Sequence, residues 1–563
     1  MNAPRSFFYF LLLLVLNLGL AGSQARAESI EALRAMPVQD GGRIKPFDTF
    51  ARESLYLIYG HETFRPEKGG SARPASEIVM TWILQPSAWE ETPLFEIRHG
   101  EVKKGLRLSE EKKHFSFREI MNSDRLPTLM QELQSHRETK EKLNPYFQAL
   151  QRLENQLFTF REIAAGRMLR LVPPKTGETW QSLPELDGAL QSQFVEISQA
   201  FIRVLGTVTG NATAEEKNQT QKILTEKIKN FETSAQAENP VLYAQGSKIQ
   251  TEIHYYDFHP FRWAWIVYLI CALTCLIAWA FEKPSFYRPA WLLGFVGLAL
   301  HIYGFSLRVY LMGRPPVSNM YETVVWVGFG AVVFSMAIEA VYRWRFILLA
   351  GTLAGAFCLM LADMAPVVLD PSLQPLEPVL RSNFWLMIHV MTITISYAAF
   401  FLSFVLGNIG LIYFLGGESK NRDKIKAVTL ALYRGMQIGV SFLAPGIILG
   451  GIWADYSWGR FWGWDPKETW ALIVVLGYLA VLHGRLVGMI KDFGMNVAAV
   501  MAFSLVIMAW YGVNFVLGAG LHSYGFGAGG VEYVAGFLAV EILFVVFASV
   551  VRFGRLKASK ENK

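Results

Sequence analysis

Long apolar runs alternate with short polar ones through the C-terminal half of the chain. A helix needs about 20 apolar residues to cross a bilayer, and nine runs after Phe261 approach that length. We therefore predict nine transmembrane helices. They lie near residues 262–281, 290–310, 321–341, 346–363, 384–416, 434–452, 467–484, 495–516 and 532–551.

Positive charge in the connecting loops predicts the orientation of these helices. The loops after the first, third, fifth and seventh runs, and the C-terminal tail, read EKPSFYR, YRWR, GESKNRDKIKAV, GRLVGMIKD and RFGRLKASKENK. All five are rich in Lys or Arg, which collect on the cytoplasmic side of membrane proteins. The remaining loops are therefore expected outside, and residues 556–563 are expected to form a cytoplasmic tail.

Residues 1–27 have the pattern of a secretory signal. Arg5 precedes the apolar run Phe7–Leu20, and an A-R-A site ends at Ala27. The run is short for a membrane span, so cleavage is predicted, with retention as an anchor as the alternative. Either outcome places residues 28–260 outside, in agreement with the loop charges.

Residues 28–260 are expected to form one mainly helical extracytoplasmic domain. Helical patterning is clearest near 128–170 and 185–235, and the segment is long enough to enclose its own core. It contains no cysteine, which excludes disulfides and thiol redox chemistry there. The predicted fold class is therefore all-α, a polytopic membrane helix bundle preceded by this domain.

Composition narrows the function classes. With 52% hydrophobic and 18% charged residues, the chain falls among membrane proteins. Its net charge of +6 is mostly the cytoplasmic Lys and Arg, so no nucleic-acid partner is expected. Cys271, Cys275 and Cys358 fall within predicted spans and form no C-x-x-C pair, which argues against a thiol relay. There is no C-x-x-C-H motif for covalent haem, no phosphate loop, no nucleophile elbow and no H-E-x-x-H site.

The segment WGRFWGWDPKETW, residues 458–470, stands between two apolar runs on the predicted outer face. Asp465 and Glu468 can form a capping box around Pro466 at the start of the next helix. Tryptophan also concentrates at membrane interfaces, so an anchored helix start is the simplest interpretation. Anchoring one helix needs far fewer than four indoles. We therefore expect Trp458, Trp462 and Trp464 to have a further role.

Two histidines are expected at the same outer level as this segment. His389 lies roughly 10 Å or less inside the outer end of the fifth span, and His522 follows the eighth span. Two imidazoles among flat aromatic rings suit haem, whose iron takes axial histidines. Arg460 and Lys467 could then meet its propionates. The alternative is that both histidines are structural residues of the interface.

Two further histidines lie deeper in the predicted membrane region. His483 lies about 17 residues into the seventh span, or roughly 26 Å from its outer end, near the inner face. His301 is expected near the middle of the second span, so the two are poor partners for one iron. A haem ligand opposite His483 would come from another chain, and His301 is interpreted as structural.

The tryptophan-rich segment resembles the WWD signature of membrane haem-handling proteins. Its form, W-G-x-F-W-x-W-D-P-K-E-x-W, is similar to the CcsA/ResC branch of the system II cytochrome c synthases. GGIWADYS, the LHGR around His483, the WLMIHV around His389 and RPPVSNMYETVVWVG from Arg314 to Gly328 are similar to the same branch. The resemblance covers about residues 255–555, so residues 261–555 are interpreted as a CcsA-like membrane haem-handling domain.

The resemblance implies roles for several residues. His389 and His522 would be axial ligands of haem b at the outer face, and His483 would belong to a second haem site within the membrane. The residues matching the signature are Trp458, Trp462, Trp464 and Asp465. Haem would be a substrate as well as a ligand, joined by thioether bonds to the C-x-x-C-H thiols of an apocytochrome c. The implied location is the bacterial inner membrane.

The resemblance also implies a partner. Members of this branch work with, or are fused to, a CcsB/ResB-like membrane protein that completes the membrane haem site, and no part of this chain supplies its spans. A separate partner is therefore expected, with this chain as one subunit of a holocytochrome c synthase, or haem lyase. No catalytic acid or base is assigned.

Three functions remain open from the sequence. The first is the haem lyase subunit, and the second is a haem exporter or chaperone that delivers haem without supporting its ligation. The third is an unrelated small-molecule transporter whose tryptophans are only interfacial. The segment MPVQDGGRIKPFDTFARES, residues 36–54, is interpreted as a loop leading into a helix, with a docking surface for apocytochrome or partner as the alternative. Asn319 and Glu322 are interpreted as a capping box for the third span.

Overall fold

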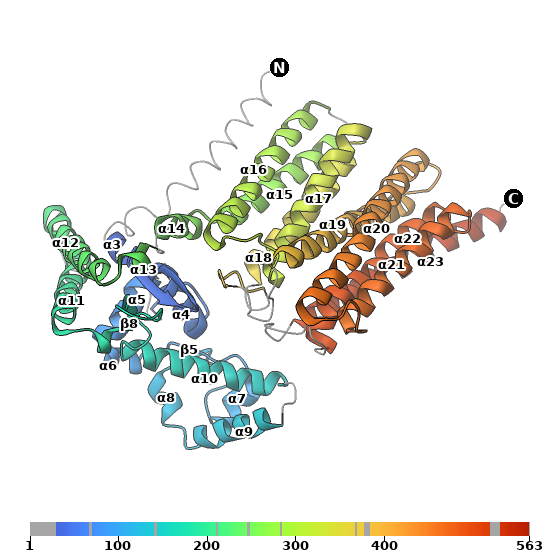
Figure 1. Cartoon of the computed structure of the whole chain (residues 1–563). Coiled ribbons are helices and arrows are strands. Elements are labelled where there is room, and N and C mark those ends of the chain that lie inside the picture. The colour runs from blue at the N-terminus through green and yellow to red at the C-terminus, as the bar shows by residue number, and fades with distance from the viewer. Residues whose placement is uncertain are drawn as a thin grey trace. The chain divides into compact units, whose positions relative to one another are not determined.

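A computed structural model describes most of the chain (Figure 1). The described residues are 30–66, 70–139, 143–209, 212–244, 248–281, 284–365, 369–375, 383–517 and 530–561. The predicted signal segment and His522 lie outside them. The chain divides into two compact units, Met1–Phe258 and His259–Lys563, called here the N-terminal unit and the membrane unit.

The N-terminal unit is mainly helical. Among its described residues there are four two-stranded antiparallel sheets and no larger one. Its helices are α3 (Glu31–Arg34), α4 (Phe47–Tyr59), α5 (Ala75–Leu84), α6 (Pro86–Glu90), α7 (Gly100–Gly105), α8 (Phe117–Met121), α9 (Leu126–Glu138), α10 (Pro145–Ala164), η2 (Leu183–Glu185), α11 (Gly188–Thr209), α12 (Ala214–Glu238), α13 (Pro240–Ala244) and α14 (Ile249–Phe258). Its strands are β1 (Pro37–Asp40), β2 (Arg43–Pro46), β3 (Thr63–Phe64), β4 (Arg73–Pro74), β5 (Phe95–Glu96), β6 (His114–Phe115), β7 (Arg170–Val172) and β8 (Gln181–Ser182).

The two stretches with predicted helical patterning each contain two helices. Residues 128–170 cover most of α9 and all of α10, and residues 185–235 cover α11 and most of α12. The break before α10 has a local cause, because the Asn144 side chain accepts a hydrogen bond from the Phe147 backbone N–H at 3.0 Å and Pro145 takes the first helical position. Helical character was therefore predictable, but the number of helices was not.

The interpretation of residues 36–54 as a loop before a helix is wrong for its first half. β1 and β2 pair as a hairpin, with Asp40 opposite Arg43. The two residues between them are Gly41 and Gly42, with φ of 58° and 77°. Positive φ at both positions is what the favoured two-residue hairpin turn requires, and glycine adopts it without strain. The helix that follows is α4, as expected.

A buried ion network ties the start of the N-terminal unit to its last helix. Asp48 on α4 accepts hydrogen bonds from Arg34 at 3.1 Å and from Arg52 at 2.8 Å. Both arginines also contact Asp257 on α14, more than 200 residues away in sequence. Burial alone would raise the pKa of the Asp48 carboxyl, but the charge of Arg52 and the hydrogen bonds of Arg34 outweigh it and lower that pKa.

Asp48→Asn should lower the free energy of unfolding by about 2 kcal/mol at pH 7. Breaking a buried ion pair costs about 3–5 kcal/mol, and Asp257 remains to compensate Arg34 in part. A lowered folded-state pKa stabilises the protein above the unfolded value of about 3.9, and this is lost as pH falls through the folded pKa. In thermal unfolding of the full-length protein followed by circular dichroism, the difference from wild type should therefore shrink in acid.

Asp124→Asn is the matched control for this prediction. Asp124 pairs with Arg107 at 3.1 Å, but both side chains are about two-thirds exposed, at 67% and 70%. Exposed pairs contribute little to stability. Equal destabilisation by the two substitutions would contradict a special role for the buried network.

The membrane unit is a helix bundle. Its described residues contain no strand, and its elements are α15 (Pro260–Ala280), η3 (Pro284–Phe286), α16 (Tyr287–Met312), α17 (Met320–Tyr342), α18 (Phe346–Met364), α19 (Asn383–Leu415), α20 (Arg422–Trp458), α21 (Pro466–Leu486), α22 (Asp492–Ile507), the π-helix η4 (Met508–Leu517) and α23 (Val531–Glu561). Within the described part of the chain, nine helices are long and apolar enough to cross a membrane. The predicted fold class is confirmed.

Helix α19 lies at the centre of the membrane unit. It packs against α17 and α18 on one side and against α20, α22 and α23 on the other, as the yellow-to-red bundle in Figure 1 shows. The helix α20 is longer than the predicted span, because it begins at Arg422 within the stretch GESKNRDKIKAV. That stretch was predicted to be a loop, and its second half is helix instead.

Candidate functional site

A cavity of about 170 Å³ lies within the membrane unit. Its walls come from the first turns of α17 and α21, the first half of α19, the last third of α20, the segments before α17 and before α21, and η4. His389, Trp453, Trp462, Lys467 and Trp510 all line it. The cavity thus joins the predicted outer histidine to the tryptophan-rich segment, although they are far apart in sequence. A π-helix such as η4 is rare and is frequently found at functional sites.

His389 is held in one orientation by α20. Its Nδ1 lies 2.8 Å from the carbonyl oxygen of Gly446, and its ring is parallel to that of Trp453 with centroids 6.3 Å apart. A carbonyl can only accept, so Nδ1 carries the proton and the lone pair of the neutral ring is on Nε2. This is the tautomer that a metal-binding imidazole adopts when a carbonyl orients it.

Trp458 and Arg460 are in contact with each other, and neither lines the cavity. Trp458, at the end of α20, contacts Trp453 edge to face with ring centroids 4.6 Å apart. The Arg460 guanidinium lies 5.7 Å from the Trp458 ring and pairs with Glu468 at 3.2 Å. Arg460 is therefore engaged by the segment itself, which weakens its predicted role as a propionate partner.

Trp462 and Trp464 differ in exposure. Trp462 is half-buried and lines the cavity, whereas Trp464 is 69% exposed. Their rings meet nearly perpendicularly, with centroids 5.8 Å apart. Trp464 has a φ of 55°, in the left-handed region that costs a non-glycine residue energy. Strain of this kind persists only where the surrounding contacts fix the backbone.

Those contacts come from the helix start at Asp465. The predicted capping box is present, with Asp465 accepting from the Lys467 backbone N–H at 3.0 Å and Glu468 accepting from the Asp465 N–H at 3.1 Å. The other role of Glu468 was not foreseen. Its carboxylate also accepts from the Gly463 N–H at 2.8 Å and from Arg460, so it fixes the loop as well as the helix.

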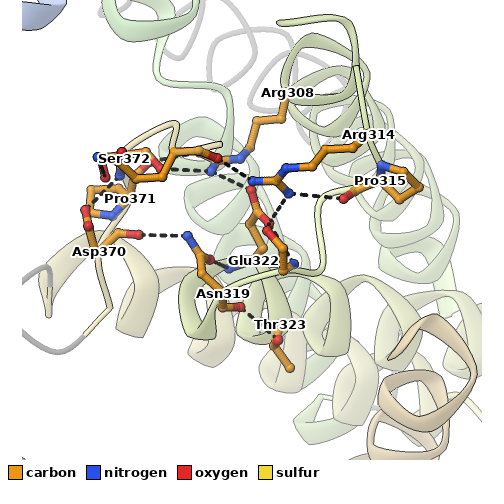
Figure 2. Close-up of polar contacts among 11 residues, drawn as sticks. Arg308, Arg314, Pro315, Asn319, Glu322, Thr323, Asp370, Pro371 and Ser372 are labelled. Atoms are coloured by element: carbon orange, nitrogen blue, oxygen red, sulfur yellow. Dashed lines mark hydrogen bonds and ion pairs between the residues drawn. The ribbon is translucent and has the colours of Figure 1, made fainter. Parts of the chain in front are cut away.

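A buried cluster of two arginines and one glutamate (Figure 2) reaches the cavity through Arg314. Glu322 pairs with Arg308 at 2.8 Å and with Arg314 at 3.1 Å, and all three side chains are at most 7% exposed. The arginines also donate to carbonyl oxygens of residues 371, 372 and 374, at 2.8 to 3.4 Å. The cluster thereby joins the segment before α17 to residues 369–375.

The predicted capping box at Asn319 and Glu322 is half right. Asn319 caps α17, because its side-chain oxygen accepts from the Glu322 N–H at 2.8 Å. The Glu322 carboxylate instead accepts from the backbone N–H and hydroxyl of Ser318, both at 2.9 Å, and from the two arginines. Its main partners are remote in sequence, so a local pattern could not reveal them.

The deeper histidines lie elsewhere. His301 is fully buried, with ring nitrogens 3.3 Å from the Tyr268 hydroxyl and 3.1 Å from the Val325 carbonyl oxygen, which fits its structural interpretation. His483 is exposed near the end of α21, with Nδ1 2.7 Å from the Leu479 carbonyl oxygen. It does not line the cavity. His522 lies outside the described residues, so its predicted pairing with His389 stays a prediction.

Three cavity residues were missed as site candidates from the sequence. They are Trp453, Trp510 and Arg314. Small residues on an apolar helix mark close packing, and Gly450 was such a signal, but the side chain that packs there is His389 rather than Trp453. Trp510 stands within an apolar run, where nothing separates a cavity residue from a buried one.

The comparisons with known proteins agree on one family. Residues 317–522 match the model of the family described as Cytochrome C assembly protein. Protein NrfI from Wolinella succinogenes is 28% identical over 512 residues, covering 86% of this chain and 53% of NrfI. The cytochrome c biogenesis protein CcsA of Synechococcus sp. strain CC9902 is 34% identical over 247 residues, covering 39% of this chain and 81% of that protein. This chain belongs to the CcsA family of cytochrome c biogenesis proteins.

Membership of the CcsA family makes this chain a multi-pass membrane protein with a role in cytochrome c maturation. The CcsA of Chlamydomonas reinhardtii, 35% identical over 220 residues, covers 38% of the chain. The match to NrfI covers more residues than the membrane unit holds, so it extends into the N-terminal unit. The chain spans about half the length of NrfI, at 53%.

Proposed function

We propose that this protein binds haem in the cavity beside the tryptophan-rich segment and presents it for covalent attachment to an apocytochrome c. One observation carries the proposal: His389, held as the Nδ1–H tautomer by Gly446, lines the same cavity as Trp453 and Trp462. Haem needs an axial nitrogen and flat apolar surfaces, and this site offers both. Trp458 packs against Trp453, and Asp465 caps the helix that follows the tryptophan-rich segment, so both help to fix these groups.

Haem is the substrate in this proposal, and the cavity receives only part of it. Its volume of about 170 Å³ is below the roughly 300–1,000 Å³ of typical ligand pockets. We therefore place the iron against His389 and extend the porphyrin toward the exposed indole of Trp464. His522 is proposed as the second axial ligand. This site would face the periplasmic side of a bacterial inner membrane, with the C-terminus cytoplasmic.

His483 is proposed to belong to a second haem site, completed by another protein. Its ring is exposed at the far end of α21, and its Nδ1 is directed to the Leu479 carbonyl. A single exposed imidazole on a membrane helix suits a ligand shared with a neighbouring chain. The CcsB/ResB-like protein expected from the sequence is the proposed partner.

Ligation requires this protein to position haem rather than to supply an acid or base. Two neutral imidazoles would keep other ligands from the iron, and one would yield to the histidine of the incoming C-x-x-C-H motif. Each thioether bond would form by addition of a cysteine S–H across a haem vinyl group, with sulfur bonding one vinyl carbon and hydrogen the other, so that no group leaves. The alternative function is a haem carrier that passes haem on without supporting this step.

Purified wild-type protein should contain haem, and His389→Ala and His522→Ala should each lose most of it. The reason is the loss of an axial nitrogen, and the measurement is an absorption spectrum with a pyridine haemochrome assay. His61→Ala is the control, because His61 is an exposed residue of the N-terminal unit. Wild type without haem, or both variants with unchanged haem, would overturn the proposal.

Co-expression with an apocytochrome c separates the lyase from the carrier. The host should lack its own maturation system, and the CcsB/ResB-like partner should be present in one arm and absent in the other. Covalent haem on the apocytochrome with the partner present is the expected result. Its absence from both arms would leave the carrier function.

A further inference from the structure

The cavity contains three hydrogen-bond donors that no described residue satisfies. They are Nε of Arg314, Nε1 of Trp462 and Nε1 of Trp510, all buried and all on residues that line the cavity. Buried donors are nearly always paired in folded proteins, so three of them at one cavity need a partner. None of the three groups can accept a hydrogen bond, so that partner must be an acceptor.

The charge of the cluster around Arg314 favours an anionic acceptor. Arg314 is 7% exposed and shares the single carboxylate of Glu322 with Arg308. The formal charges of these three side chains sum to +1, and Figure 2 shows both guanidinium groups on the one carboxylate. A second anion at Arg314 would improve the balance of charge in a site that water does not screen.

Glu468 is the acidic residue among the described residues that line the cavity, and it is already engaged. Its oxygens accept from Arg460 and from two backbone N–H groups, those of Gly463 and Asp465. It therefore does not satisfy the donors of Arg314, Trp462 and Trp510. The described residues leave that acceptor to a molecule that enters the cavity.

We propose that Arg314, together with the indole N–H groups of Trp462 and Trp510, binds a carboxylate of the ligand that enters the cavity. This deepens the proposed function and rests on it, because haem carries two propionate groups. Arg314 then takes the role predicted for Arg460, whose guanidinium is held by Glu468. Lys467, the other predicted propionate partner, lines the same cavity. Arg308 makes the same pair with Glu322 but does not line the cavity, so it is a positioning residue only.

Binding of haem and of haem dimethyl ester to the purified full-length protein tests this proposal. The ester has the same iron and ring but neither negative charge. Wild type should bind haem roughly tenfold more tightly than the ester, the size of a charge-assisted hydrogen bond. Arg314→Gln should bring the ratio of the two affinities close to one. Trp510→Phe, which removes the indole N–H together with part of the aromatic surface but keeps an aromatic ring, should lower that ratio by a smaller factor.

Arg308→Gln is the matched control, because it breaks the other ion pair of Glu322 at a residue that does not line the cavity. It should keep the preference for haem over the ester. An equal loss of preference in both arginine variants would make the effect structural and overturn the proposal. So would equal binding of the two porphyrins by wild type, or a preference abolished by added phosphatidylglycerol, which would identify a lipid headgroup as the anion. Binding of neither porphyrin would instead overturn the proposed function.

Discussion

Glu322→Gln should sharply lower the thermal stability of the membrane unit. The substitution keeps the size of the side chain but removes the carboxylate that Arg308 and Arg314 share. Two guanidinium groups, at 1% and 7% exposure, would then be left without their anion. Losing one partner of a buried ion pair costs about 3–5 kcal/mol, and here two pairs are lost at once. Thermal unfolding of the purified protein in detergent measures the effect.

Asp363→Asn is the control for Glu322→Gln. Asp363 also pairs with an arginine of the membrane unit, Arg262, at 3.0 Å, but the two side chains are 22% and 45% exposed. Its removal should shift the unfolding temperature only slightly, because partly exposed pairs are screened by solvent. Similar shifts for the two variants would show that the cluster at Glu322 is no more important than a surface pair.

The architecture of the membrane unit was accessible from the sequence because its cause is local. Each span is a run of apolar residues of bilayer length, and the start of α21 is encoded within four residues from Asp465 to Glu468. The hairpin of β1 and β2 was accessible too, since its D-G-G turn is a recognised signal. It was overlooked in favour of a loop.

The cavity was only partly accessible, because its walls come from segments that meet in space. The tryptophan-rich segment and His389 could be placed at one level of the membrane by counting residues along helices. No local pattern, however, indicates that Arg314 and Trp510 reach the same cavity, or that Glu322 accepts hydrogen bonds from Arg308 rather than closing a capping box. These roles depend on contacts between residues far apart in the chain, and local patterns in a single sequence do not predict such contacts.

Gly450→Ala should disrupt the candidate haem site without unfolding the protein. A Cβ at this position would lie 2.4 Å from Cε1 and 2.7 Å from Nδ1 of His389, so the imidazole must move. If the imidazole moves, it loses its 2.8 Å contact with the Gly446 carbonyl. Without that contact, nothing selects the tautomer with the proton on Nδ1. Losing a group that orients a metal ligand lowers affinity by about 10–100-fold. The haem content of the purified variant should fall accordingly.

Gly536→Ala separates this clash from the effect of replacing a helical glycine. Gly536 lies on α23, and a Cβ there would meet nothing within 4 Å. Alanine favours a helix over glycine by about 1 kcal/mol, so Gly536→Ala should leave thermal stability unchanged or higher and haem content equal to that of wild type. Gly450→Ala gains the same helix preference, and a loss of haem from it must therefore come from the displaced imidazole. A Gly450→Ala protein with the wild-type haem spectrum and stoichiometry would show that the position of His389 does not govern haem binding.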